Sequence, residues 1–224
     1  MAKSQRHSPL EATTGDLSSP IRPGGRPAKR RAILDGALAV FAQDGYTRAS
    51  IDAISAAAGV STRTIYNHFK DKAQLFQTVV EESTTGVAGF QITVIDRHLD
   101  HVTDLESDLV QLGLALAAPM TAYEEHFALV RQIDADAGHI PPAALDAWRD
   151  AGPRRVLGVL AGRLRELADR DLLRIDDPHR AAVHLMLLVQ GAVPFHHGMA
   201  TISEADVAEV VTAGVRAFLH GYLP

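Results

Sequence analysis

The most informative chemistry in the sequence lies in residues 58–69, AGVSTRTIYNHF, where polar side chains surround an apolar pair. Ile65 and Phe69 are four residues apart, so on a helix they share one face, which we expect to point into a core. Their polar neighbours then face outward, and these are Arg63, Thr64, Asn67 and His68. Arginine and asparagine form paired hydrogen bonds with the edges of guanine and adenine in the major groove. The spacing therefore predicts a helix that reads double-stranded DNA.

The preceding residues predict the elements that position such a helix. Residues 59–61 form a turn between two short helices, because glycine allows a steep change of direction and Ser61 can cap the helix that follows. Ser50 can cap the first short helix, whose inner face is formed by Ile51, Ile54 and Ala58. A longer helix is expected from Pro27 to a glycine cap at Gly45. This order of elements predicts a helix-turn-helix.

The charges are segregated along the chain. The 224 residues carry a formal net charge of −5, which taken alone disfavours a nucleic-acid partner. Residues 22–80, however, hold nine Lys or Arg against four acids, whereas the rest of the chain from residue 81 holds eleven against twenty-one. This distribution is typical of a basic DNA-binding head on an acidic body.

Residues 28–80, including YNHFKDKAQLF from Tyr66 to Phe76, resemble the DNA-binding head of the TetR family of transcriptional regulators. The resemblance implies that phosphates are met by Tyr66, His68 and Lys72, and that Thr47 and Ser50 anchor the first short helix to the backbone. It also implies that bases face Thr62, Arg63, Thr64 and Asn67. The alternative is a three-helix packing unit whose polar face is only solvated.

Residues 1–25 mix Ser, Thr, Pro and Gly without periodicity, which predicts a disordered tail that ends in basic residues. Arg26 lies between a flexible glycine lead and Pro27, so it could enter an adjacent minor groove. The alternative is that the basic stretch attracts phosphates without sequence preference. The N-terminus lacks the apolar run of a signal peptide, no stretch is long enough to span a bilayer, and cysteine is absent, so we expect a cytoplasmic protein with no membrane partner.

Helix signals continue behind the head. Residue pairs with capping-box spacing are Asp71 with Gln74, Thr103 with Glu106, and Thr121 with Glu124. Further starts or breaks are expected at Pro141-Pro142, Gly152-Pro153, Asp177-Pro178 and Ser203. No sustained alternation of polar and apolar residues predicts a strand. The fold class is therefore all-α, with a DNA-binding domain over residues 26–75 and an effector-binding and dimerisation domain over 76–224.

Two apolar segments near the C-terminus predict a homodimer. Residues 179–195 are apolar on nearly every side, and the terminal helix has an apolar stripe at three- and four-residue steps. The expected interface residues are Val183, Leu187, Val207, Val211, Val215 and Phe218. The family resemblance implies that these helices form a two-fold four-helix bundle. The alternative is that both segments belong to the core of a single chain.

The resemblance also implies an apolar cavity for an unknown small-molecule effector between head and interface. Its expected apolar lining is Phe90, Met120, Phe127, Trp148 and Met186, with His126 and Arg131 as polar contacts, although each residue could equally serve core packing or the surface. Residues 146–164 resemble the C-terminal domain of an AefR-like subgroup. The expected action is repression that ends when the effector binds.

Other functional classes lack supporting motifs. No glycine-rich phosphate loop, nucleophile elbow or cofactor fingerprint is present, so we expect no enzyme, no catalytic residue and no cofactor. The histidine pairs at 98 and 101 and at 196 and 197 lack further ligands at established spacing, so no metal site is expected. A dimeric architectural DNA-binding protein without an effector remains the alternative function.

Overall fold

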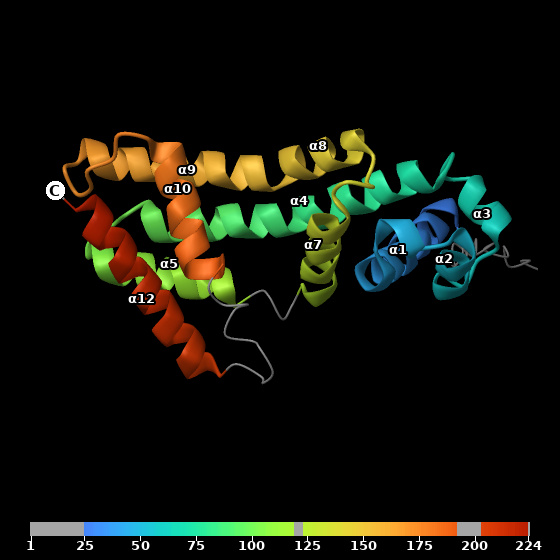
Figure 1. Ribbon diagram of the computed structural model, residues 1–224, viewed down its shortest axis with the longest axis horizontal. Coiled ribbons are helices and arrows are strands. Elements are labelled where there is room, and N and C mark those ends of the chain that lie inside the picture. The colour runs from blue at the N-terminus through green and yellow to red at the C-terminus, as the bar shows by residue number, and fades with distance from the viewer. Residues whose placement is uncertain (1–24, 119–122, 192–202, 224) are drawn as a thin grey trace, which may run out of the picture.

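The computed structural model describes residues 25–118, 123–191 and 203–223, and within these ranges it contains helices and no strand. The all-α prediction is confirmed. The molecule is elongated (Figure 1): α1 (Arg26–Arg48), α2 (Ile51–Ala57) and α3 (Thr62–Tyr66) form a head at one end. The long helix α4 (Lys72–Leu99) runs from that head into the body.

The head has the predicted helix-turn-helix, and glycine residues allow the sharp turns and the close packing of its helices. Gly45 has a φ of +74° and interrupts α1 near its end, while Gly59 has a φ of +62° in the turn between α2 and α3. Both values fall in the left-handed region that glycine adopts without a steric penalty. Gly36 lets α1 and α2 pack closely, because a Cβ built there would lie 2.7 Å from the backbone nitrogen of Ala58.

The hydrophobic core of the head extends beyond its first four helices. Its centre is formed by buried residues of α1 to α4, namely Ile33, Phe41, Ile54, Ile65 and Phe76. Leu129 and Ile133 of α7 (Glu124–Asp136) and Ala144 of α8 (Pro142–Ala151) belong to the same buried cluster. A domain boundary was predicted between residues 75 and 76. Helix α7 and the start of α8 follow that boundary in the sequence, but they pack with the head.

A second core holds the body together. It joins α4 to α5 (Leu105–Ala117), α9 (Pro153–Asp169), α10 (Pro178–Met186) and α12 (Glu204–Tyr222). A π-helical turn, η1 (Leu187–Gly191), follows α10. The helix expected over 179–195 is therefore α-helical to Met186 and π-helical to Gly191, and residues 192–195 lie outside the described ranges. At the far end of the molecule α12 lies against α5, α10 and η1 (Figure 1).

The predicted dimer interface needs correction. Val211, Val215 and Phe218 are almost completely buried in the body core of one chain. The stripe of α12 therefore packs against its own subunit, which was the alternative interpretation. Val207 is half-buried against the same core, whereas Leu187 of η1 has 62% of its surface exposed. Val183 is half-buried on α10.

Most predicted helix starts coincide with observed caps. Asp71, Asp177 and Ser203 cap α4, α10 and α12, and Ser203 forms a reciprocal capping box with Asp206. The start predicted at Thr103 is wrong by one residue, because Asp104 accepts the hydrogen bond from the Ser107 amide at 2.8 Å. Thr121 lies outside the described residues. The break at Gly152 is present and lies directly against the side chain of Thr84.

Across the described ranges, none of the helices is both long enough and apolar enough to cross a membrane.

Candidate DNA-binding interface

Helix α3 presents a polar surface because its apolar residues are fixed inside the head. Ile65 and Phe69 retain 1% and 4% of their accessible surface. Arg63, Tyr66 and Asn67 are exposed. The predicted separation of an inner apolar face from an outer polar face is therefore present, and α3 is oriented to offer hydrogen-bonding groups to a partner.

The N-terminus of α3 is held by its own cap, which also involves Thr64. Ser61 Oγ accepts a hydrogen bond from the Thr64 amide at 3.2 Å and lies 2.9 Å from Thr64 Oγ1. The hydroxyl of Thr64 is thus engaged in the cap, whereas a base contact was expected. Thr62 is half-buried beside it. Arg63 on α3 and Asn67 at its C-cap are both exposed, and their base contacts stay predictions.

Several expected phosphate ligands lie at accessible positions. Thr47 and Ser50 are exposed at the corner between α1 and α2, and Ser50 Oγ accepts a hydrogen bond from the Ala53 amide at 3.0 Å. Its hydroxyl proton is still available for a phosphate oxygen. Tyr66 is 55% exposed, and His68 is half-buried beside it. That these groups bind phosphates stays a prediction.

Lys72 forms several contacts within the head. Its ammonium donates to the carbonyl oxygens of Tyr46 at 2.9 Å and Ala49 at 3.0 Å, with the carbonyl of Thr47 at 3.5 Å. It also lies 4.7 Å from the centre of the Tyr46 ring. The ammonium of Lys72 thus bonds to the end of α1, and its contact with a phosphate stays a prediction.

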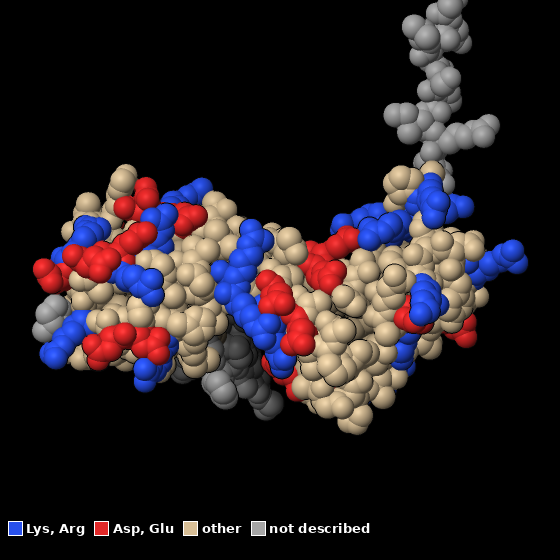
Figure 2. Space-filling view, turned by 90° about the horizontal axis from the view of Figure 1, so that it is seen from above, with Lys and Arg blue, Asp and Glu red and all other residues tan. Residues whose placement is uncertain are grey.

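Positive charge gathers at the head. Figure 2 shows Lys and Arg projecting from the end that carries α1 to α3, while acidic and basic residues are mixed over the body. Arg26 is the first residue of α1 and is exposed, so it belongs to a helix rather than to a flexible lead. Residues 1–24 of the predicted tail lie outside the described residues.

Sequence reasoning passed over Lys70, which is exposed between the buried Phe69 and the capping Asp71. The segment YNHFKDK contains both lysines, and the family resemblance pointed to the second.

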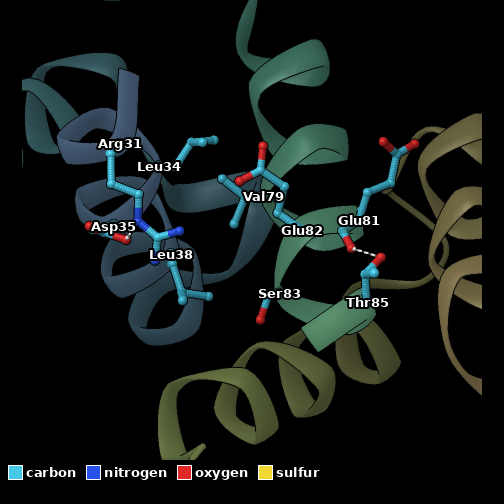
Figure 3. Close-up of a pocket in the computed structure, with 9 residues that line it drawn as sticks. All are labelled: Arg31, Leu34, Asp35, Leu38, Val79, Glu81, Glu82, Ser83 and Thr85. Atoms are coloured by element: carbon cyan, nitrogen blue, oxygen red, sulfur yellow. Dashed lines mark hydrogen bonds and ion pairs between the residues drawn. The ribbon is translucent and has the colours of Figure 1, made fainter. Parts of the chain in front are cut away.

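A cleft of about 470 Å³ lies between α1 and α4, where the head meets the body (Figure 3). Its apolar side is formed by Leu34, Leu38 and Val79, and its charged residues are Arg31, Asp35, Glu81 and Glu82. Arg30 pairs with Glu82 at 2.8 Å and so bridges α1 and α4 beside the cleft. None of the residues predicted to line an effector cavity belongs to this cleft.

The residues predicted to line that cavity are divided between two cores. Trp148 packs against the head core and Met186 against the body core, while Arg131 is exposed. Met120 lies outside the described residues. Phe90 is partly exposed on α4, with its ring centre 6.4 Å from that of Tyr123, and Phe127 is half-buried one turn further along the chain. Tyr123 is an aromatic neighbour that sequence reasoning missed.

His126 is buried between α7 and α4. Its Nδ1 atom lies 2.9 Å from Ser83 Oγ, and the side chain keeps only 7% of its accessible surface. Burial lowers the pKa of His126 to about 4, because the charged imidazolium would lose its hydration. The neutral ring therefore connects the helix that leaves the head with the helix packed on α1.

Both parts of the chain match family models of known proteins. Residues 33–79 match the family model for bacterial regulatory proteins of the tetR family, and residues 107–224 match the C-terminal domain of AefR-like transcriptional repressors. The transcriptional repressor Rv1474c of Mycobacterium tuberculosis is 43% identical over 61 residues, which are 27% of this chain and 33% of the repressor. The match thus spans about a third of the length of this repressor and of a second curated relative, the transcriptional regulator AcrR of Shigella flexneri.

Solved structures extend the similarity over nearly the whole chain. A structure described as a TetR-family transcriptional regulator from Mesorhizobium loti MAFF303099 has a TM-score of 0.75 and 31% identity, and the match covers 89% of this chain and 99% of that one. The flavonoid-responsive regulator FrrA has a TM-score of 0.60 and 27% identity, with coverage of 88% and 98%. Since the C-terminal family model covers more than half of the chain, the protein belongs to the TetR family of transcriptional regulators.

Proposed function

We propose that the protein is a dimeric, cytoplasmic repressor that recognises a DNA operator through α3 and releases it when a small molecule binds. The observation that carries this proposal is the orientation of α3. Ile65 of α3 and the nearby Phe69 are buried in the head, while Arg63 of α3 and Asn67 at its C-cap are exposed. A solvated face alone would not require an exposed arginine and asparagine beside a capped turn and a basic surface.

Recognition would divide between two groups of side chains. Arg63 and Asn67 would bond to base edges, with Thr62 beside them, and so would provide sequence preference. Thr47, Ser50, Tyr66 and His68 would hold phosphates on either side and fix the register of α3. For this function the useful division of the chain is a tail over 1–25, a DNA-binding domain over 26–75 and a sensing and dimerisation domain over 76–224.

Selection of bound fragments from random duplexes at physiological salt tests DNA recognition directly. The proposal requires a palindromic site whose half-sites are about 34–36 Å apart, because a two-fold dimer presents two copies of α3 to one side of the duplex. Log affinity should also fall by about 0.9 per neutralised phosphate for each decade of salt. Recovery of unrelated sequences together with a shallow salt slope would refute the proposal.

Effector release is the finer part of the proposal. Similarity over most of the chain to FrrA, which is described as flavonoid-responsive, supports the expectation of a small-molecule ligand without identifying it. The partly exposed aromatic residues around Phe90, Tyr123 and Phe127 are the best candidates for its apolar contacts. A panel of small aromatic compounds should contain one that raises Tm and lowers operator affinity at fixed salt. A compound that raises Tm but leaves operator affinity unchanged would contradict the coupling.

A constitutive dimeric DNA-binding protein is the second candidate, and one observation favours it. Trp148 and Met186 pack into different cores, so two residues of the predicted effector cavity cannot face a common ligand without rearrangement. Under this alternative the body is a dimer clamp, operator binding persists, and no compound in the panel shifts Tm.

A further inference from the structure

Arg30 connects the first turns of α1 to two other parts of the head. Residues 25–31 are all exposed, and the first buried residue of the helix is Ile33. The helix also begins without a side-chain cap. Within this exposed stretch, Arg30 Nη2 lies 2.8 Å from Glu82 Oε1 on α4, and Arg30 Cζ lies 5.8 Å from the centre of the Phe69 ring. One guanidinium thus contacts both α4 and the residue that follows α3.

Phe69 is one of two apolar anchors on which the orientation of α3 depends. The helix has only five residues, so its own hydrogen bonds are too few to hold it and tertiary packing must do so. Ile65 and Phe69 supply that packing, and the Phe69 amide donates to the Ile65 carbonyl at 2.9 Å. A guanidinium near the face of an aromatic ring is attracted by its negative potential. Arg30 therefore contacts one of the two residues that orient α3.

Glu82 holds the guanidinium of Arg30 in this place. Its side chain projects from α4 toward α1 (Figure 3), and the side chains of Arg30 and Glu82 remain 45% and 41% exposed. An unpaired arginine would lose rotamer freedom on settling against the Phe69 ring, and the ion pair offsets part of that loss. Among the described residues, this pair is the one ion pair between α1 and α4.

The neighbouring charged residues bond within their own helices. Arg31 pairs with Asp35 of α1 at 2.9 Å, and Glu81 accepts a hydrogen bond from Gln77 of α4 at 2.9 Å. Arg31 and Glu81 are thus adjacent in sequence to the interhelical pair and carry the same charges. They provide matched controls for substitutions of that pair.

We propose that Arg30 is a positioning residue that holds α3 for DNA recognition, and that Glu82 acts by keeping Arg30 against the Phe69 ring. This inference rests on the proposed function and adds to it a connection from α4 through α1 to α3. The competing role for an exposed arginine of the head is direct contact with a phosphate. The two roles predict opposite effects at Glu82, because a positioning arginine needs its carboxylate, whereas a phosphate ligand is released by its loss.

Glu82→Gln in the full chain decides between the two roles. An exposed ion pair favours one arrangement by a factor of up to about five. Loss of the carboxylate should therefore lower operator affinity by about two- to fivefold for each head. If Arg30 instead binds a phosphate, the variant should bind more tightly, because the guanidinium is freed and a negative charge is removed. An affinity equal to or above that of the control variant would overturn the proposal.

Glu81→Gln is that control, because it removes the same charge one residue earlier from a side chain that bonds within α4. Arg31→Met is the matching control for Arg30→Met, which should weaken operator binding beyond the loss that any arginine of this turn would cause. The double variant Arg30→Met/Glu82→Gln should bind no more weakly than Arg30→Met alone, since the two residues act as one unit. Losses that simply add would mean that the two side chains act independently, against the proposal.

Hydrogen exchange tests the positioning role without DNA. Exchange at the Phe69 amide should be about two- to fivefold faster in Arg30→Met and Glu82→Gln, and should keep the parent rate in Arg31→Met and Glu81→Gln. The Tm of all four variants should stay within about 4 °C of the parent, because the pair is exposed. Parent rates at this amide in both test variants would overturn the proposal. If the parent protein bound no duplex, the proposed function would fail, while exchange at the Phe69 amide would still judge whether the pair holds α3.

Discussion

Arg63 is the residue on which base discrimination should depend most directly. Its guanidinium can bond to two acceptors on one guanine, and such a pair provides about 1–3 kcal/mol of discrimination against the wrong base. Arg63→Ala should therefore relax preference at one position of each half-site and leave Tm unchanged, because the side chain is exposed. Arg165→Ala, an exposed arginine of the body, is the control for loss of charge. Equal weakening on every sequence would show that Arg63 contacts only phosphate.

His126 should make stability depend on pH. Its pKa in the folded protein, about 4, is below the ordinary value of 6.5, so the unfolded chain binds the proton first as pH falls. The stability that depends on the neutral ring is complete above pH 6.5 and is lost between about pH 6.5 and 4. From pH 7.5 to 5.5 the loss from this one group is about 1.4 kcal/mol.

Urea unfolding of the parent protein, His126→Asn and His139→Gln at both pH values measures this contribution. Asparagine can keep a hydrogen-bonding atom near Ser83 but does not titrate, so His126→Asn should show a smaller loss of stability on acidification. His139 is exposed and serves as the control for removal of a histidine. The same pH dependence in all three proteins would exclude His126 as its source.

At the scale of single residues, the sequence was sufficient for Ile65, Phe69, Arg63 and Asn67, because helical periodicity alone decides which face is apolar. It did not predict the partners that Lys72 and Thr64 have within the chain. The residue type determines which bonds a side chain can make, but the fold determines its partner. The Lys72 ammonium donates to a carbonyl oxygen at the end of α1, and the Thr64 hydroxyl shares a hydrogen bond with the Ser61 hydroxyl.

At the scale of elements, two helical glycines should respond oppositely to alanine. A Cβ at Gly36 would meet the backbone of Ala58, so Gly36→Ala should separate α1 from α2 and cost about 1–3 kcal/mol. Gly86 in α4 has open space where a Cβ would lie, so Gly86→Ala should stabilise the helix by about 1 kcal/mol. Thermal unfolding of both variants tests the pair. A stabilised Gly36→Ala protein would mean that the contact between α1 and α2 is looser than described.

Helix boundaries were predictable where a local rule decides them. Ser50, Ser61, Asp71, Asp177 and Ser203 were all identified as caps, because a short polar side chain before an apolar run satisfies the first amides of a helix in any surroundings. At α5 two adjacent residues could cap, and Asp104 does so in place of Thr103. Asp108 accepts hydrogen bonds from the amides of both Thr103 and Asp104, which fixes that register.

At the scale of the whole molecule, an apolar stripe indicates burial but not the surface that covers it. The stripe of α12 has the same spacing whether it faces a second subunit or its own chain, and here Val211, Val215 and Phe218 face their own core. The same limit applies to the division into domains, because Leu129 and Ile133 lie far along the chain from the head core that they join. Such contacts depend on how helices are arranged in space, which periodicity within one helix does not encode.

Because the apolar stripe of α12 is buried in its own chain, the second subunit should bind a different surface. Its outer face carries Ala213, Ala217 and Gly221 at four-residue spacing, all exposed, and the hydrogen bond of 2.7 Å between His184 and Tyr222 joins this helix to α10. Leu187, the most exposed large apolar side chain described, follows directly after α10. We therefore expect the two-fold partner to cover Leu187 and the small residues of α12, rather than the buried stripe.

Leu187→Glu should consequently dissociate the dimer without unfolding the subunit, because a carboxylate buried between two chains would lose its hydration, whereas in a monomer it stays in water. Light scattering should report a mass close to 24.1 kDa at micromolar concentration, with helical content unchanged. The salt slope on operator should fall to about half, since one head reaches only half of the phosphates. Ala143→Glu, which adds the same charge at an exposed position of α8, should remain dimeric. A Leu187→Glu protein that stayed dimeric would place the two-fold axis on another surface, and the spacing of the two α3 helices would have to be derived again from that surface.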